Sequence, residues 1–180
     1  VTDDPEVARE CRAMRDHGRE GGLMTMLGFN YRMTELAAAL GLSQLRRVDE
    51  FIARRRELSR LYVQALSEVF QSGALSRPDI DIDRSACHLF PVLFPDDASR
   101  DAARLSLYIA GYGSQIHYQP IVPLHPYYRE RFGYREGMWP VAEDAAKRLL
   151  SLPLHPGMAE EDVGRAVGVL ERCQLTTVAS

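Results

Sequence analysis

Residues 27–45 read Leu27-Gly28-Phe29-Asn30-Tyr31-Arg32-Met33-Thr34-Glu35-Leu36-Ala37-Ala38-Ala39-Leu40-Gly41-Leu42-Ser43-Gln44-Leu45. Gly28 closes a glycine-bearing loop that opens at Gly18, and Thr34 has the hydroxyl side chain typical of a helix N-cap. The helix after Thr34 carries Leu36 and Leu40 on the face expected to point inward. Its alanines have small side chains, so we expect another element to approach this helix closely and the helix to be deeply buried.

The end of this loop has the chemistry of an anion site. Asn30 offers an amide N–H, Arg32 offers a planar fork of donors, and the start of a helix carries partial positive charge. Together these groups suit a phosphate. On local chemistry alone a structural interpretation stays open, in which Asn30 makes a turn and Arg32 pairs with an acid.

Helices are expected on both sides of this stretch. Before it, Asp4 and Pro5 predict an N-cap and a first helical residue, with Val7, Cys11 and Met14 on one face and an end at Gly18. After it, apolar residues spaced in threes, fours and sevens predict one long helix from 46 to about 70. The helix at the N-terminal side and the long helix thus flank the loop.

The second half of the chain mixes strands and helices. Periodicity predicts strands at 88–94 and 114–118, and helices at about 99–110, 141–150 and 160–173. In the helix at 99–110 the residues expected to face inward are Ala102, Leu105 and Ile109. A polar connector at 76–84 precedes this half, and the whole pattern indicates a helix-rich α/β protein.

Composition excludes several classes. The 180 residues are 46% hydrophobic and 26% charged with net charge −3, which fits a folded domain and argues against a basic nucleic-acid footprint. No apolar run approaches the roughly 20 residues of a membrane span. The odd, scattered cysteines Cys11, Cys87 and Cys173 argue against a disulfide framework, and no signal peptide opens the chain. We therefore expect a cytoplasmic protein, and the missing initiator Met suggests a fragment.

Common catalytic motifs are absent from the sequence. None of its five histidines forms an i, i+4 pair or a zinc-finger spacing, so no metal site is expected. Phosphate-loop, dinucleotide-binding and nucleophile-elbow motifs are also missing. His117 stands at the end of the expected strand, where binding residues often lie. A structural histidine is the alternative.

The quoted stretch resembles the signature of the DegT/DnrJ/EryC1/StrS family of nucleotide-sugar aminotransferases. Segments at 15–18, 51–56 and 150–157 agree with the family in the same order. Segments at 88–92, 116–120 and 124–129 most resemble the pseudaminic-acid pathway transaminases, which form UDP-4-amino-4,6-dideoxy-N-acetyl-β-L-altrosamine. Related members that act on other nucleotide sugars share most of these residues.

The resemblance implies the C-terminal portion of a fold-type I aminotransferase subunit of about twice this length. It implies an α/β fold of long helices plus a small mixed or antiparallel sheet. Residues 1–45 would end the large domain that binds pyridoxal phosphate (PLP), 46–75 would form a long connecting helix, and 76–180 would form the small C-terminal domain.

The implied reaction moves an amino group from glutamate to C4 of a UDP-linked 4-keto-6-deoxy sugar in surface-glycan biosynthesis. The implied cofactor is PLP and the implied assembly is a homodimer, with no nucleic-acid or membrane partner. Asn30 and Arg32 match the family pair that reaches the neighbouring subunit's PLP phosphate or substrate. His117 and Tyr118 match the segment that lines the sugar-nucleotide pocket.

The family's Schiff-base lysine would fall upstream of Val1, so no catalytic residue is expected in this chain. Lys147 is its one lysine and lies in a predicted helix, where a solvated side chain is expected. Because PLP chemistry needs the Schiff-base lysine, the chain alone is expected to be inactive. The alternative is a non-catalytic protein, regulatory or a decayed remnant, that binds a nucleotide sugar or PLP. An in-frame lysine upstream would separate the two.

Overall fold

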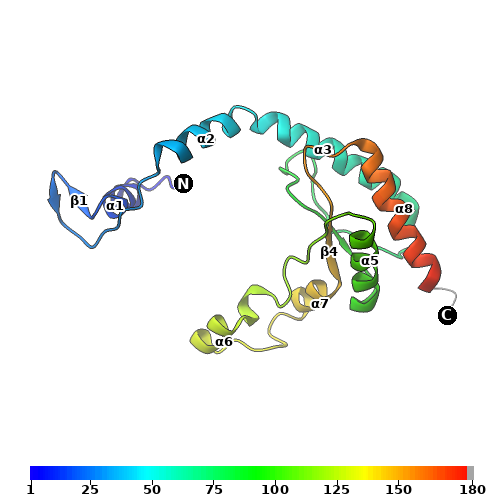
Figure 1. Ribbon diagram of the computed structural model, residues 1–180. Coiled ribbons are helices and arrows are strands. Elements are labelled where there is room, and N and C mark those ends of the chain that lie inside the picture. Colours follow the sequence, from blue (N-terminus) through cyan, green and yellow to red (C-terminus); the bar gives the residue numbers. More distant parts are fainter. Residues whose placement is uncertain (178–180) are drawn as a thin grey trace. The chain divides into compact units, whose positions relative to one another are not determined.

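The computed structural model describes residues 1–177, and the chain divides into two compact units, Val1–Val48 and the residues from Asp49 onward. Figure 1 draws the first unit in blue and the second from cyan to red. Among the described residues, no helix is both long and apolar enough to cross a bilayer. The domain limits 1–45, 46–75 and 76–180 stay predictions, and residues 178–180 of the last one lie outside the described part.

The first unit contains two helices linked by a small hairpin. Its elements are α1 (Pro5–Arg15), β1 (Arg19–Glu20), β2 (Leu23–Met24) and α2 (Glu35–Leu45). Both expected N-caps are confirmed. The Asp4 carboxylate accepts hydrogen bonds from the first turn of α1, and the Thr34 hydroxyl accepts one from the Ala37 N–H at 3.2 Å.

Two glycines allow the chain to cross itself in the first unit. A Cβ atom on Gly28 would lie 1.8 Å from the Gly18 backbone nitrogen, and Gly18 itself has φ +70°. No side chain fits at this crossing. The crossing is held by backbone hydrogen bonds, from the His17 N–H to the Phe29 carbonyl and from the Tyr31 N–H to the Arg15 carbonyl, both at 2.9 Å.

The expected packing of the first two helices was wrong. No residue of α2 is buried, and Leu36 is 85% exposed. In α1 the predicted face of Val7, Cys11 and Met14 is exposed, and Ala13 is buried instead. An apolar helix face indicates that another element packs against it, but the sequence of the helix does not identify that element. Within residues 1–48, no element buries a residue of α2.

The second unit holds the remaining elements. They are α3 (Val48–Ala65, whose first residue belongs to the first unit), α4 (Ser67–Gln71), β3 (Phe90–Leu93), α5 (Asp97–Ile109), the 3-10 helix η1 (Val122–Leu124), α6 (Pro126–Phe132), α7 (Pro140–Arg148), β4 (Leu149–Leu152) and α8 (Glu160–Thr177). The single long helix expected at 46–70 is broken at Leu66. This residue is fully buried and leaves helical geometry with φ −92° and ψ 8°.

An antiparallel sheet lies at the centre of the second unit. Strands β3 and β4 pair with Phe90 opposite Leu152 and Val92 opposite Leu150, and these four side chains are buried. The expected strand at 114–118 is reduced to a bridge between Gln115 and Ser151. The predicted α/β class, helices with a small antiparallel sheet, is confirmed.

Helices α3, α5 and α8 contribute to the same core as the sheet, and α5 and α8 run side by side (Figure 1). The predicted inward face of α5 was wrong. Leu105 and Ile109 are exposed, whereas Arg100, Ala103 and Leu107 are buried. Helical periodicity assigns an arginine to the solvent-exposed face of a helix. Because Arg100 is buried instead, the buried face of α5 lies about half a turn away from the predicted face.

Two long-range hydrogen bonds fasten α3 to the segment after β4. The Tyr62 hydroxyl donates to the Pro153 carbonyl at 2.9 Å, and its ring stacks on Phe90 with centroids 4.8 Å apart. The Arg54 guanidinium donates to the Met158 carbonyl at 2.9 Å. Burial raises the pKa of the Tyr62 phenol, so the hydroxyl remains a donor through the neutral range.

A carboxylate closes the turn before α7. Glu143 accepts hydrogen bonds of 3.0 Å from the backbone N–H groups of Gly137 and Trp139. The Gly137 donor first, and then the Trp139 donor, hold the pKa of the Glu143 carboxyl below its usual range. This turn is therefore stabilised by an ionised side chain.

Candidate functional site

The hairpin of the first unit brings Asn30 and Arg32 together. Asn30 forms a bridge with Asp16 across the glycine crossing. The Arg32 Nε donates to the Asn30 Oδ1 at 3.2 Å, and the Arg32 Nη1 lies 3.5 Å from the Asp16 Oδ1. Arg32 therefore pairs with an acid, as the structural interpretation expected, and it also contacts the Asn30 amide shortly before α2. The phosphate interpretation stays a prediction.

This arrangement leaves donors available to a ligand. Asn30 uses its carbonyl oxygen for Arg32, which leaves its amide NH2 group without a partner among the described residues. The Asp16 Oδ1 is buried and accepts no hydrogen bond, so the Arg32 cation balances it across 3.5 Å. The site thus offers directed N–H donors with little excess charge, and the positive end of α2 adds to them.

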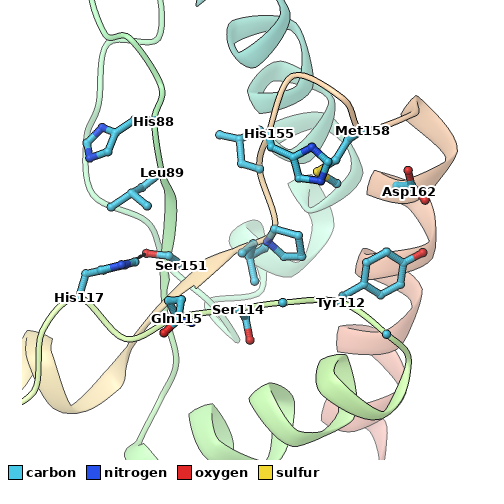
Figure 2. Close-up of a pocket in the computed structure, with 15 residues that line it drawn as sticks. His88, Leu89, Tyr112, Ser114, Gln115, His117, Ser151, His155, Met158 and Asp162 are labelled. Atoms are coloured by element: carbon cyan, nitrogen blue, oxygen red, sulfur yellow. Dashed lines mark hydrogen bonds between the residues drawn. The ribbon is translucent and has the colours of Figure 1, made fainter. Parts of the chain in front are cut away.

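A pocket of about 590 Å³ lies within the second unit (Figure 2). Figure 2 shows His117 beside Ser151, with Tyr112 and Asp162 toward the other side. Most of its polar lining residues carry side chains that can both donate and accept hydrogen bonds. These residues are His88, Ser114, Gln115, His117, Ser151 and His155. Among the described residues no lysine or arginine lines the pocket, so it favours hydroxyl-bearing or amide-bearing groups.

His117 is held by a partner that sequence analysis missed. Its Nδ1 lies 3.0 Å from the Ser151 Oγ, and Ser151 is only 3% exposed. Tyr118 packs edge-on against the His117 ring at 5.2 Å, but it is 60% exposed and does not line the pocket. The structure therefore places His117 in the cavity and Tyr118 beside it.

A buried arginine fixes the chain just after His117. Arg100 is 3% exposed, and its Nη1 donates to the Gln119 Oε1 at 2.8 Å while its Nε donates to the Asp101 Oδ1 at 2.8 Å. No sequence signal marked Arg100, because an arginine in an amphipathic helix usually faces solvent.

The opposite side of the pocket is charged. The Arg165 guanidinium donates to Asp162 at 2.6 Å and to the Tyr112 hydroxyl at 3.0 Å. Arg165 first, and then the Ala159 backbone N–H, hold the pKa of the Asp162 carboxyl below its usual range. Asp162 is thus an anion at neutral pH with its charge already paired.

The remaining candidates take no part in either site. Lys147 is exposed near the end of α7 and does not line the pocket. In the described part of the chain, no group of three or more His, Cys, Asp or Glu side chains is placed to hold a metal ion. Asn30 and Arg32 lie in one unit and His117 and Tyr118 in the other.

The model of the DegT/DnrJ/EryC1/StrS aminotransferase family matches residues 1–171. This chain belongs to that family. It is 34% identical over 181 residues to the spore coat polysaccharide biosynthesis protein SpsC of Bacillus subtilis strain 168, which covers 91% of this chain and 46% of SpsC. The chain spans about half the length of the curated relatives that it matches.

Solved structures of aminotransferases share the fold. The Helicobacter pylori aminotransferase PseC, which takes part in pseudaminic-acid biosynthesis, matches with a TM-score of 0.84 and 26% identity, over 98% of this chain and 48% of PseC. NtdA from Bacillus subtilis, solved with bound cofactor PMP, matches with a TM-score of 0.81 and 25% identity, over 97% of this chain and 41% of NtdA. The fold of this chain is therefore that of sugar-aminotransferase relatives.

Proposed function

We propose that this chain forms part of a PLP-dependent sugar aminotransferase. The proposed reaction transfers an amino group from glutamate to C4 of a UDP-linked 4-keto-6-deoxy sugar in surface-glycan biosynthesis. The observation that carries this proposal is the family match over residues 1–171. The likeness to SpsC and PseC supports a sugar substrate, and the likeness of segments 88–92, 116–120 and 124–129 to the pseudaminic-acid pathway transaminases supports this particular one.

Asn30 and Arg32 fit the phosphate of PLP. A phosphate needs N–H donors directed at its oxygens, and the free Asn30 amide, the Arg32 fork and the start of α2 supply them. The paired Asp16 lowers the net charge of the site, which favours binding through directed hydrogen bonds. We propose that this pair contacts the cofactor or substrate of a neighbouring subunit in a homodimer.

When bound, PLP supplies the electron sink that amino-group transfer requires. The residues of this chain bind and orient. His117 lines the pocket, which would hold the hydroxyl-bearing sugar of the nucleotide sugar, and Tyr118 offers an exposed aromatic face beside it. Because Lys147 is exposed on α7 and does not line the pocket, we propose that these residues alone do not transaminate.

The proposed location is the cytoplasm. Neither Cys11, which is exposed, nor Cys87, which is buried, forms a disulfide bond in the described part of the chain. Cysteines that form no disulfide are typical of a reducing compartment.

The test uses the whole polypeptide as its gene encodes it. Arg32→Ala should weaken PLP binding, followed by cofactor absorbance in a titration, or raise the Michaelis constant for the sugar nucleotide, while circular dichroism stays unchanged. Arg12→Ala is the matched control, because Arg12 is an exposed arginine of α1 and belongs to neither site. Equal cofactor affinity and equal Michaelis constants in both variants would contradict the role of Arg32.

A second arm tests the pocket. His117→Gln should raise the Michaelis constant for the UDP-sugar and leave that for glutamate unchanged. Transfer to other keto sugars with equal efficiency would contradict the proposed substrate. Sugar-nucleotide binding without any transfer of nitrogen from ¹⁵N-glutamate would favour a non-catalytic binding protein.

A further inference from the structure

We infer that Ser151 is a positioning residue that sets the tautomer of His117, so that the neutral imidazole presents an Nε2–H donor to the ligand. The inference on the tautomer rests on geometry alone. Its consequence for substrate binding rests on the proposed function.

Ser151 has little freedom to move. It lies within β4, and its backbone is paired in both directions with Gln115, through N–H to O=C distances of 2.8 and 3.2 Å. It is only 3% exposed, although it lines the pocket. Its side-chain rotamer places the Oγ 3.0 Å from the His117 Nδ1.

Among the described residues, the Ser151 hydroxyl has one hydrogen-bond partner, the His117 ring. The Oγ lies 3.0 Å from the His117 Nδ1, and no other acceptor pairs with it among the described residues. A buried donor without an acceptor costs about 1–3 kcal/mol, whereas a hydroxyl oxygen tolerates an unused lone pair. Ser151 therefore donates to Nδ1, which leaves the ring hydrogen on Nε2.

The chain is anchored again two residues later. The buried Arg100 holds the Gln119 side chain at 2.8 Å, so the segment after His117 is tied to α5 while the ring is tied to β4. These two hydrogen bonds come from different elements, α5 and β4. His117 is thus oriented before any ligand arrives, which reduces the ordering that binding must supply.

The ligand chemistry follows from the tautomer. The His117 Nε2 has no partner among the described residues, and as an N–H it pairs with an acceptor oxygen. A keto, hydroxyl or phosphate oxygen of a sugar nucleotide meets this requirement. A ligand group that only donates hydrogen bonds would meet a second donor at the His117 Nε2–H, which is unfavourable. Because Ser151 sets the tautomer of His117, it contributes to ligand specificity through this ring.

The first experiment reads the tautomer directly. Two-bond ¹H–¹⁵N spectra are recorded on the whole protein labelled with ¹⁵N-histidine, and His117→Gln assigns the signals of His117. Spectra recorded at a pH above the usual titration range of an imidazole are expected to show a pyrrole-type Nε2 and a pyridine-type Nδ1. A pyrrole-type Nδ1 in the wild-type protein would overturn the inference, whatever the variants do.

Two variants then separate positioning from general packing. Ser151→Ala should give a mixture of His117 tautomers, and Ser151→Thr, which keeps a hydroxyl, should restore the wild-type pattern. Ser59→Ala is the matched control, because Ser59 is equally buried at 1% exposure and its Oγ lacks a partner among the described residues. An unchanged tautomer in Ser151→Ala, or the same mixture in Ser59→Ala, would refute the role of Ser151.

Kinetics distinguish this inference from the proposed function. Ser151→Ala should raise the Michaelis constant for the sugar nucleotide roughly 3- to 10-fold, the effect of one ordinary hydrogen bond, with kcat nearly unchanged. Tautomer mixing without any change in this constant would overturn the specificity part of the inference. If His117→Gln also leaves the constant unchanged, the proposed role of His117 fails while the tautomer assignment stands.

Discussion

Replacing Tyr62 with Phe removes one hydroxyl from the core of the second unit and leaves the ring in place. The ring is fully buried and stacked on Phe90, so the packing should survive. The change breaks the 2.9 Å hydrogen bond to the Pro153 carbonyl and leaves that half-buried acceptor without its donor. We expect a loss of about 1–2 kcal/mol in the free energy of unfolding.

The magnitude separates this effect from a packing defect. Removal of the whole ring in Tyr62→Ala should cost about 3–5 kcal/mol, because a cavity is added to the lost transfer energy. Urea unfolding followed by circular dichroism measures both variants, and the expected signature of Tyr62→Phe is a lower midpoint with an unchanged denaturant slope. Because Pro153 also lines the pocket, the variant should loosen that side of the pocket too.

The control is Tyr108→Phe, since Tyr108 is 77% exposed on α5. It should change the free energy of unfolding by less than about 0.5 kcal/mol. If Tyr62→Phe proves as neutral as this control, the hydrogen bond between α3 and the segment after β4 contributes nothing and the reasoning is refuted.

The inward face of α5 can be tested with two alanine variants. Leu107→Ala should lower the free energy of unfolding by about 2–5 kcal/mol and Leu105→Ala by less than about 0.5 kcal/mol, and the reverse order in urea unfolding would restore the face predicted from periodicity. Gly18→Ala should disrupt the hairpin of the first unit, because its Cβ would lie 1.9 Å from a carbonyl oxygen, whereas Gly21→Ala meets only the strain of φ +55° in open space. Circular dichroism and proteolysis of the loop compare the two, and equal sensitivity would contradict the chain crossing. Since the pKa of Glu143 is lowered by backbone donors, its contribution is present above about pH 4 and is lost as pH falls through the lowered value. Glu143→Gln should therefore flatten the acid limb of a stability profile measured by thermal unfolding, and an identical acid limb in both proteins would argue against it.

Local signals predicted local structure well. Asp4 and Thr34 begin helices where their side chains and spacing indicated, because an N-cap depends only on the next three residues. The α/β class with a small antiparallel sheet was likewise predicted. The glycines at 18 and 28 were noticed in the sequence, but their close approach was not, because it joins positions ten residues apart.

Burial was less predictable than helix position. The face of α5 was wrong because Arg100 is buried through Gln119, a partner 19 residues away. The expected strand at 114–118 keeps only its bridge at Gln115, since strand pairing depends on tertiary context as well as on local propensity. The periodicity of hydrophobic residues along one segment does not reveal tertiary partners of this kind.

The candidate sites also differ in how far their contacts could be predicted from the sequence. Asn30 and Arg32 are two residues apart, and the structure keeps them in contact. His117 could be proposed from its place at a strand end and from the family resemblance. Ser151 stands 34 residues further along the chain, and nothing in its neighbourhood marked it as the partner of His117.

The two hydrogen bonds from α3 to the segment after β4 can form only late in synthesis, because their acceptors are translated long after α3. Tyr62 and Pro153 are 91 positions apart, and Arg54 and Met158 are 104 apart. At translation rates of roughly 5–20 residues per second, α3 leaves the ribosome about 5–20 s before these partners are made. Throughout that interval its apolar face is exposed, so the nascent chain of this protein should be a chaperone client until β4 and α8 emerge and close the core.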